Sequence, residues 1–307
     1  MSFGAGICGM LSAIIEYECA VQRGDGAMDL RPGAENRQKR EWLRRDSRSA
    51  SAKAGALTPF RQFFATSSVT CPYIVGRAER KLIVELGGNG AALFYDDLSR
   101  AGFRRSHGFA YRPACRGCSS CVPVRIAVDR FSHTRSTRRI RNANRDLSGR
   151  LLAARATPEQ FRLFSAYQRS RHSESDMASM SYGDYRGMVE HTPVRTAIIE
   201  SRDISGELVA ASLIDLLDDG VSAVYSFYDP QQPKRSLGTW SILWLVEQCR
   251  RHGQPFVYLG YWISDSPKMA YKARFPALER LAHGAWTEFA SDAAGPIPFP
   301  SPQAGEG

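Results

Sequence analysis

The clearest pattern along the chain is a set of apolar segments in its second half. Residues 194–202, 207–217 and 220–228 are rich in aliphatic and aromatic side chains, and short turns that contain Asp and Gly separate them. Such runs are typical of strands, and turns this short join neighbouring antiparallel strands. We therefore predict a three-stranded antiparallel meander in this region.

A helix and a further strand are predicted after the meander. Residues 237–252 place large apolar side chains at helical spacing, and Gly253 marks the end of that helix. Residues 256–259 are apolar and predict a buried strand. The order of meander, helix and strand predicts an α+β fold of the acyl-CoA N-acetyltransferase-like (GNAT-like) type, in which the helix packs across the sheet.

The first half predicts shorter elements around a loop rich in cysteine. Helices are expected over residues 91–101, 136–147 and 157–171, and strands over residues 81–86, 109–112 and 122–128. We divide the chain into a disordered polar lead-in over residues 1–58, an N-terminal domain with the cysteines over 59–150, the GNAT-like domain over 151–290, and a disordered tail over 291–307.

The chain of 307 residues contains no apolar run long enough to cross a bilayer. The best candidate, residues 7–21, is interrupted by Glu16 and Glu18 and has no basic leader before it. Seven cysteines, an odd number, argue against a disulfide framework. We therefore expect a cytoplasmic protein without a membrane partner.

Positive charge is concentrated in one segment. Residues 101–150 contain twelve Arg and two Asp but no Lys or Glu, so this segment has a charge of +10, equal to the formal net charge of the whole chain. Such a concentration favours a polyanion, nucleic acid first, over a merely solvated surface. Arg138, Arg141 and Arg145 fall on one face of the expected helix and are our candidates for contact with RNA.

Three cysteines lie within seven residues of one another. Cys115, Cys118 and Cys121 follow an isolated Cys71, and four thiolates can close a tetrahedral zinc site. The tight spacing also resembles part of an iron–sulfur ligand run. Reduced thiols that pack the turn are the alternative, and the spacing does not choose between zinc and a cluster.

An aromatic loop follows the last predicted strand. The rings of Tyr261 and Trp262 are candidates to stack on an adenine or to hold an aminoacyl side chain. The alternative is an aromatic plug that closes the edge of the sheet.

Several strings of the chain together resemble the arginyl-tRNA–protein transferase family, in particular its bacterial aspartate/glutamate leucyltransferase branch. The resemblance covers residues 71–275 and rests on the strings CPYIVGRAERK, LSRAGFRRSHGFAYRPACRGCSSCVPVRI, YSFYDP, RSLGTWSILW and YLGYWISDSPKMAYKARF. Eukaryotic members have a CxxC and a paired CC, whereas this chain has one early cysteine and then CRGCSSC, so their cofactor does not transfer directly.

The resemblance implies an enzyme that moves Leu, or less readily Arg, from aminoacyl-tRNA to the N-terminal Asp or Glu of a protein, which marks that protein for N-end-rule degradation. Aminolysis of an ester is downhill, so we expect no cofactor to be required for the transfer; no GxxxxGK[ST] string is present. The sequence leaves the oligomeric state open.

The attacking amine must be neutral, and donors must face the developing oxyanion. Asp229, at the end of the third strand, is the candidate to hold the amine or relay its proton; the alternative is a turn residue before Pro230. The candidate catalytic tyrosines are Tyr225, Tyr228, Tyr258 and Tyr271.

Selection of an acidic N-terminus requires a cation beside the amine. The candidates in the matched strings are Arg77, Arg80, Lys268 and Lys272, and we expect Arg77 to act with Lys268.

Two other functions fit parts of the sequence. An acetyl-CoA-dependent N-acetyltransferase needs a pyrophosphate cradle, and residues 235–240 match its first half but place Trp240 where Gly or Ala is expected. A non-enzymatic zinc-ribbon RNA-binding module would account for the cysteines and arginines, but not for the second half.

Overall fold

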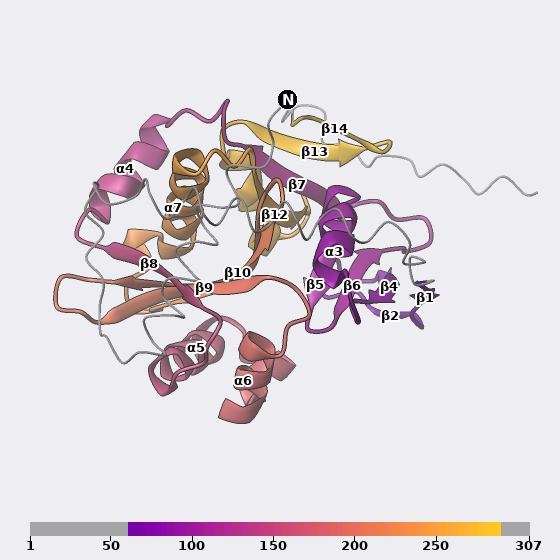
Figure 1. Ribbon diagram of the computed structural model, residues 1–307, viewed down its shortest axis with the longest axis horizontal. Coiled ribbons are helices and arrows are strands. Elements are labelled where there is room, and N and C mark those ends of the chain that lie inside the picture. The colour runs from indigo at the N-terminus through magenta and orange to yellow at the C-terminus, as the bar shows by residue number, and fades with distance from the viewer. Residues whose placement is uncertain (1–60, 290–307) are drawn as a thin grey trace, which may run out of the picture.

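An eight-stranded mixed sheet forms the centre of the computed structural model, which describes residues 61–289 (Figure 1). The strand order is β14-β13-β7-β12-β11-β10-β9-β8. The strands are β7 (Val122–Ala127), β8 (Ser148–Ala153), β9 (Thr196–Arg202), β10 (Leu208–Leu217), β11 (Gly220–Tyr228), β12 (Phe256–Trp262), β13 (Leu278–Ala282) and β14 (Ala285–Glu288).

The predicted order of elements in the second half is confirmed. Strands β9, β10 and β11 form the antiparallel meander, and every residue of β10 is buried. Helix α7 (Leu237–Arg251) follows and crosses the sheet, and β12 then adds parallel to β11. This is the GNAT-like layout expected from the sequence.

Helices cover both faces of the central sheet (Figure 1). On one face α7 packs with α4 (Arg135–Ala143), and its apolar side meets Ile199, Ile214 and Val221. On the other face α5 (Pro158–Arg171) and α6 (Tyr182–Glu190) cover the alternate residues of the same strands. Because both faces are covered, the central strands are apolar throughout rather than alternating.

A smaller sheet precedes the central one. Its order is β1-β4-β6-β5, with helix α3 beside it and the short β2–β3 pair nearby. Its core shares Leu217 and Tyr258 with the central sheet. The elements are β1 (Phe63–Ala65), β2 (Val69–Thr70), β3 (Ala78–Glu79), β4 (Lys81–Glu85), α3 (Ala91–Arg100), β5 (Arg104–Ser106) and β6 (Phe109–Pro113).

The two halves of the chain are interleaved. Strand β7 comes from the first half yet pairs with β12 and β13 in the middle of the central sheet. The boundary that we predicted at residue 150 falls inside β8. The predicted lead-in over residues 1–58 and the tail over residues 291–307 lie outside the described residues.

Some elements differ from those predicted. Helix α4 ends at Ala143, four residues early, because the Asn144 side chain donates to the carbonyls of Ile140 and Arg235 at that end. Among the elements that were not predicted are strands β1, β2, β3, β5, β8, β13 and β14 and helix α6. Between residues 61 and 289, none of the helices combines the length and the apolar character that crossing a membrane requires.

Candidate active site

Strands β11 and β12 diverge after a short paired stretch. Only residues 220–222 of β11 pair with residues 256–258 of β12. Beyond them β11 stays paired with β10 through Tyr228, and β12 follows β7 instead. We call residues 223–228 of β11 and residues 259–262 of β12 the fork.

Arg104, at the start of β5, reaches into the fork. Its Nη2 donates to the carbonyl oxygens of Ala223 and Val224, at 2.8 and 3.0 Å. On the other side lies Gly260, where a Cβ atom would be 1.9 Å from Arg104 Nη1. Gly260 also has φ of 76° at an irregularity in the β7–β12 pairing, so both the space and the backbone conformation require glycine. Our sequence reasoning missed Arg104.

The neighbouring arginine points the other way and is fully paired. Arg105 donates from Nε and Nη2 to the two carboxylate oxygens of Asp215, each at 2.8 Å. The side chains are 1% and 0% exposed. This buried ion pair fixes β5 to β10, and with it the position from which Arg104 extends.

Lys272 is the second cation beside the fork. It lies in the turn η4 (Tyr271–Arg274) and is 7% exposed, and its Nζ donates to the carbonyl oxygen of Tyr261 at 2.6 Å. No carboxylate among residues 61–289 forms an ion pair with it. Burial, together with the nearby charge of Arg104, lowers the pKa of Lys272 to about 7.

Three of the predicted catalytic tyrosines are brought together next to the fork. The ring centroids of Tyr228 and Tyr167 are 4.8 Å apart, and Tyr225 accepts a hydrogen bond from Gln168 Nε2 at 2.8 Å. Burial and the neighbouring Tyr228 raise the pKa of Tyr271 to about 12. We call Tyr225, Tyr228 and Tyr271 the tyrosine cluster.

Lys268 lies near the tyrosine cluster, on the short helix α8 (Pro267–Ala270). Burial and then the charge of Lys268 lower the pKa of His172, whose ring centroid is 5.6 Å from that of Tyr167. Lys268 therefore lies on the same side as the cluster, and its role as a substrate-binding residue stays a prediction.

Arg77 and Arg80 are placed in different surroundings. Both line a cavity of about 420 Å³ beside the cysteine loop, and Arg80 Nε donates to the carbonyl of Thr66. The cavity is also lined by Thr66, Ser67, Ser68, Ala78, Cys115, Arg116 and Cys118. Lys268 does not line this cavity, and our expectation that Arg77 acts with Lys268 stays a prediction.

The aromatic residues of β12 turn inward. Tyr261 is buried, with its hydroxyl 3.0 Å from the carbonyl oxygen of Gly102, and Trp262 Nε1 donates to the carbonyl of Ala270. The Trp262 ring packs against Phe289. These contacts support the alternative, an aromatic plug, rather than stacking on a substrate.

Tyr258 and Asp229, two of the predicted catalytic residues, form hydrogen bonds to other parts of the protein. The buried Tyr258 hydroxyl donates to Asp219 and accepts from Arg125. The Asp229 carboxylate accepts from the backbone N–H of Gln231 and the side chain of Gln232, which closes the turn after β11. The placement of Tyr258 and Asp229 does not support a catalytic role for either.

The four predicted metal ligands lie near one another as free thiols. Burial, followed by the charges of Cys115, Cys118 and Cys71, raises the pKa of Cys121 to about 12. Within the described part of the chain, no three His, Cys, Asp or Glu side chains are arranged to hold a metal ion. The arrangement therefore gives no support to the expected zinc or iron–sulfur site.

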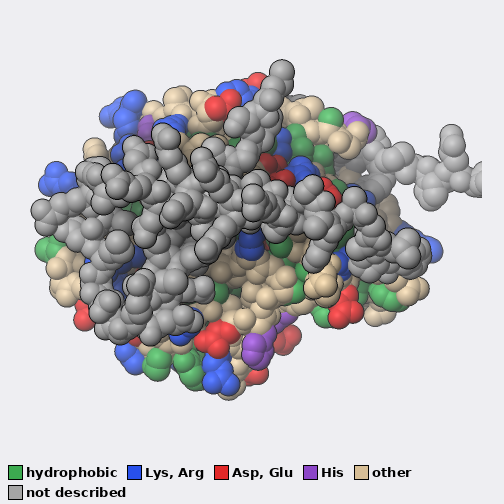
Figure 2. Space-filling model, in the orientation of Figure 1, with side chains coloured by type: hydrophobic (Ala, Val, Ile, Leu, Met, Phe, Trp, Pro, Cys, Tyr) green, Lys and Arg blue, Asp and Glu red, His purple; other side chains and the backbone are tan. Residues whose placement is uncertain are grey.

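The predicted RNA-binding arginines are exposed. Arg138 and Arg141 lie on the outer face of α4, whereas Arg145 follows the end of the helix. Basic side chains are visible at the edge of the molecule where α4 lies, at the upper left of Figure 2. The inner face of α4, with Thr137 and Ile140, packs toward α7.

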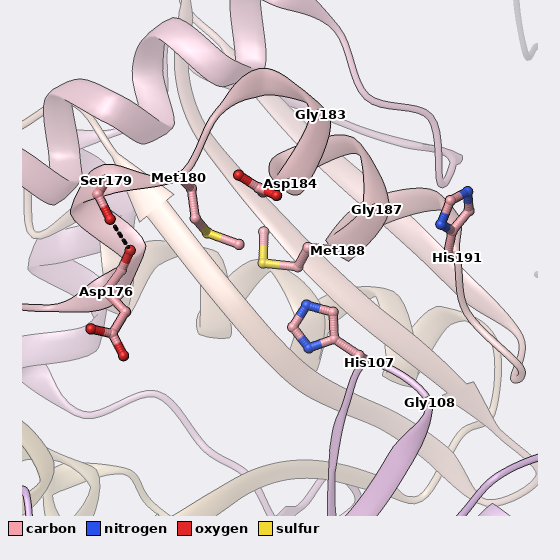
Figure 3. Close-up of a pocket in the computed structure, with 10 residues that line it drawn as sticks. All are labelled: His107, Gly108, Asp176, Ser179, Met180, Gly183, Asp184, Gly187, Met188 and His191. Carbon is pink, nitrogen blue, oxygen red and sulfur yellow. Dashed lines mark hydrogen bonds between the residues drawn. The ribbon is translucent and has the colours of Figure 1, made fainter.

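A larger pocket, of about 680 Å³, lies away from all the predicted residues. Figure 3 shows His107, from the turn between β5 and β6, pointing toward Met188 of α6. Asp176 and Ser179, in the turn η2 (Asp176–Ser179), lie at the other side. None of the residues at the fork lines this pocket.

The side chains that would form a pyrophosphate cradle for coenzyme A make other contacts in this structure. Arg235, in the turn η3 (Pro233–Arg235), donates from Nε to Asn144 at 2.8 Å and also pairs with Asp146. Its guanidinium is therefore engaged by the α4 region. Trp240 is buried on the inner side of α7 and does not crowd the helix N-terminus as we had expected.

Comparison with known proteins identifies relatives over most of the chain. Residues 69–139 and 159–282 match the family descriptions "Arginine-tRNA-protein transferase, N terminus" and "Arginine-tRNA-protein transferase, C terminus". The aspartate/glutamate leucyltransferase of Paramagnetospirillum magneticum is 54% identical over 74% of this chain and 93% of its own length. That of Gluconacetobacter diazotrophicus is 51% identical over 78% and 94%. A solved structure described as "Crystal structure of FemX" has a TM-score of 0.38 and 9% identity, over 76% of this chain and 70% of that one.

Proposed function

The chain belongs to the arginine-tRNA-protein transferase family, and from this membership we propose that it transfers leucine from leucyl-tRNA to the N-terminal Asp or Glu of an acceptor protein. Membership confirms the predicted enzyme class, an aminoacyltransferase. The names of the relatives support leucine over arginine as the donor and acidic residues as acceptors. We further propose that the new N-terminal leucine marks the acceptor for N-end-rule degradation.

The reaction is the aminolysis of an ester. The acceptor nitrogen forms a bond to the ester carbonyl carbon, the bond from that carbon to the 3′ ribose oxygen of tRNA breaks, and a proton from the amine ends on the ribose oxygen. The α-amine, with a pKa near 8, must first lose a proton. A base beside the reacting centre and fixed donors to the carbonyl oxygen are therefore the groups to identify.

Lys272 is the proposed base, and its placement is the observation on which the mechanism rests. A pKa of about 7 leaves a substantial neutral fraction at neutral pH. The hydrogen bond from its Nζ to the Tyr261 carbonyl orients the amine and leaves the nitrogen lone pair free to accept a proton. We propose that the acceptor ammonium first releases one proton to solvent, and that Lys272 then takes a second proton from the attacking nitrogen as the N–C bond forms and returns it to the leaving ribose oxygen.

The tyrosine cluster is proposed to stabilise the oxyanion. Burial raises the pKa of Tyr225 to about 12, so its hydroxyl remains protonated at neutral pH. Because that oxygen accepts from Gln168, its own proton is available for donation to the ester carbonyl. Tyr271 is proposed as the second donor, and Lys268 as a contact for the tRNA 3′ end.

The remainder of the tRNA is proposed to lie across α4. Arg138 and Arg141 have no carboxylate partner among residues 61–289 and present their charge to solvent. Phosphate contacts from such arginines supply affinity without reading sequence.

A transfer assay tests the proposed function. Purified protein is mixed with leucyl-, arginyl- or phenylalanyl-tRNA and a peptide that begins with Asp, and the extended peptide is measured by mass. We expect extension with leucyl-tRNA and little with the other two. Extension only with arginyl-tRNA would replace the donor, and extension only in the presence of acetyl-CoA would replace the enzyme class.

A further inference from the structure

We propose that Arg104 binds the side-chain carboxylate of the acceptor's N-terminal Asp or Glu and thereby selects acidic acceptors. This inference rests on the proposed function and assigns the selecting cation to the fork instead of to Arg77. Three features support it: how the guanidinium is held, how β12 makes room for it, and which charges surround it.

The Arg104 guanidinium is fixed in position, but some of its hydrogen-bond donors have no acceptor among the described residues. The two hydrogen bonds from Nη2 to the Ala223 and Val224 carbonyls anchor it to β11. Behind it, the buried Arg105–Asp215 pair fixes β5. No acceptor among residues 61–289 pairs with Arg104 Nε or Nη1, and the side chain is only partly buried. Three N–H groups, one on Nε and two on Nη1, therefore remain for a ligand.

Strand β12 is shaped around this side chain. At Gly260 a Cβ atom would lie 1.9 Å from Nη1 and 2.6 Å from Cζ of Arg104, so any other residue would displace the guanidinium. A positive φ and the irregular pairing with β7 occur at the same position. The regular pairing of β12 with β7 is therefore interrupted at the position where the guanidinium lies.

The local charge is unbalanced. Arg104 lies close enough to Lys272 for its charge to lower the lysine pKa, and neither forms an ion pair with a carboxylate among the described residues. The fixed charge of Arg104, without a carboxylate partner and beside a lysine that is only partly protonated at neutral pH, favours an anionic ligand. An acceptor Asp or Glu brings that anion to within a few bonds of the α-amine, which must reach Lys272. The leaving group at the reacting centre is an uncharged ribose hydroxyl, so it does not require this positive charge.

The test compares acceptors within single preparations of enzyme. Wild type, Arg104→Gln and Arg104→Lys are assayed with leucyl-tRNA and four peptides that differ only in their first residue: Asp, Glu, Asn or Gln. Arg186→Gln is the matched control, because it makes the same charge change on the exposed surface of α6. The ratio of kcat/KM for Asp over Asn does not depend on how much enzyme is active, so partial misfolding of a variant does not obscure it.

In Arg104→Gln we expect the Asp-over-Asn and Glu-over-Gln ratios to fall about 10- to 100-fold, the usual size of a charge-assisted hydrogen bond, with transfer to Asn changed only a few-fold. Arg104→Lys, which keeps the charge but not the planar group, should retain part of the ratio, and its result decides the question if Arg104→Gln yields no soluble protein. Ratios that stay at the wild-type value while all four acceptors decline together would overturn the inference alone. Absence of leucine transfer by the wild type would overturn the proposed function and the inference with it.

Discussion

Two arginines on either side of β12 have opposite surroundings. Where β7, β12 and β13 meet, Arg125 donates to Glu279 at 2.7 Å and its Cζ lies 3.4 Å from the centroid of the Phe256 ring. We call this region the closed end; it consists of Arg125, Asp219, Phe256, Tyr258, Glu279 and Trp286. At the fork, Arg104 has two backbone carbonyls and no carboxylate among the described residues.

The difference separates a structural arginine from a site arginine. At the closed end Arg125 is paired with Glu279, the Tyr258 hydroxyl and aromatic rings, although the buried Asp219 Oδ1 has no hydrogen-bond partner among the described residues. At the fork, strand pairing stops, and cations and hydroxyls have unused capacity. We infer that charges and hydrogen-bond donors without a partner, rather than the residue type, identify the site.

The largest effect is expected at the fork. Lys272→Met should lower kcat/KM for leucine transfer about 10²- to 10⁴-fold, the usual contribution of a positioned base. The free energy of unfolding should not fall, because an apolar side chain replaces a buried amine without a carboxylate partner. Transfer kinetics and urea unfolding of the same variant measure both. A variant that is active but unstable would make Lys272 structural.

At the closed end the pattern should reverse. Arg125→Met should lower the free energy of unfolding by about 3 kcal/mol, because Glu279 loses its buried partner and keeps only the more exposed Arg130. Arg104→Met, at the fork, should cost about 1 kcal/mol, since it loses only hydrogen bonds to backbone carbonyls. Denaturant midpoints compare the two directly, and equal losses would erase the distinction between closed end and fork.

The dependence of stability on pH sharpens the assignment of Lys272. Its folded pKa of about 7 lies below the ordinary lysine value of 10.5, so between these values the unfolded chain binds a proton that the folded chain does not. Wild-type stability, measured relative to Lys272→Met, should therefore rise with pH above about 7, by roughly 1.4 kcal/mol per unit. Unfolding series at pH 7, 8 and 9 provide the comparison. A flat difference would mean that Lys272 has an ordinary pKa.

Two tyrosine variants also compare the closed end with the fork, with smaller expected effects on stability and transfer. Tyr258→Phe removes the hydroxyl between Arg125 and Asp219 and should cost about 1–3 kcal/mol of stability while transfer stays within a few-fold. Tyr225→Phe removes a proposed oxyanion donor and should lower kcat about tenfold or more, and it should also cost about 1–3 kcal/mol of stability because the buried Gln168 Nε2 loses its acceptor. Thermal unfolding and single-turnover transfer report the two quantities.

The smallest effect is expected on α4. Replacing Arg138 and Arg141 with Ala should leave stability and saturated turnover unchanged, and should flatten the salt dependence of tRNA affinity by about two units in the log–log slope. The single variant Arg145→Ala, beyond the end of the helix, is the comparison. An unchanged slope in the double variant would mean that this face is only solvated.

The sequence predicted the elements whose signal is local. Residues 220–228 and 237–251 became β11 and α7 with their predicted starts, because a long periodic run and short turns specify them without distant partners. The family resemblance brought the tyrosine cluster and Lys272 to attention before their surroundings were known, and their roles in the chemistry stay predictions.

What the sequence did not predict depends on distant partners. Tyr258, Tyr261 and Trp262 belong to a strand covered on both faces, so the alternation that separates inward from outward side chains is absent there. Arg104 is one of twelve arginines in residues 101–150, and only the divergence of two later strands and the glycine at 260 distinguish it. The consecutive arginines at the start of a strand were a usable signal, because neighbours in a strand point to opposite faces.

The interleaving of β7 has a consequence for how the protein is made. Arg125 on β7 and its partner Glu279 on β13 are separated by 154 residues, which at about 5–20 residues per second takes a ribosome roughly 10–30 s to synthesise. Until β12 is made, Val124 and Ile126, both fully buried in the finished sheet, have neither neighbouring strand, and until β13 is made they have only one. The nascent chain thus has an unpaired apolar strand while the roughly 130 residues between β7 and β12 are made, and the order of its strands therefore adds to its need for chaperones during synthesis.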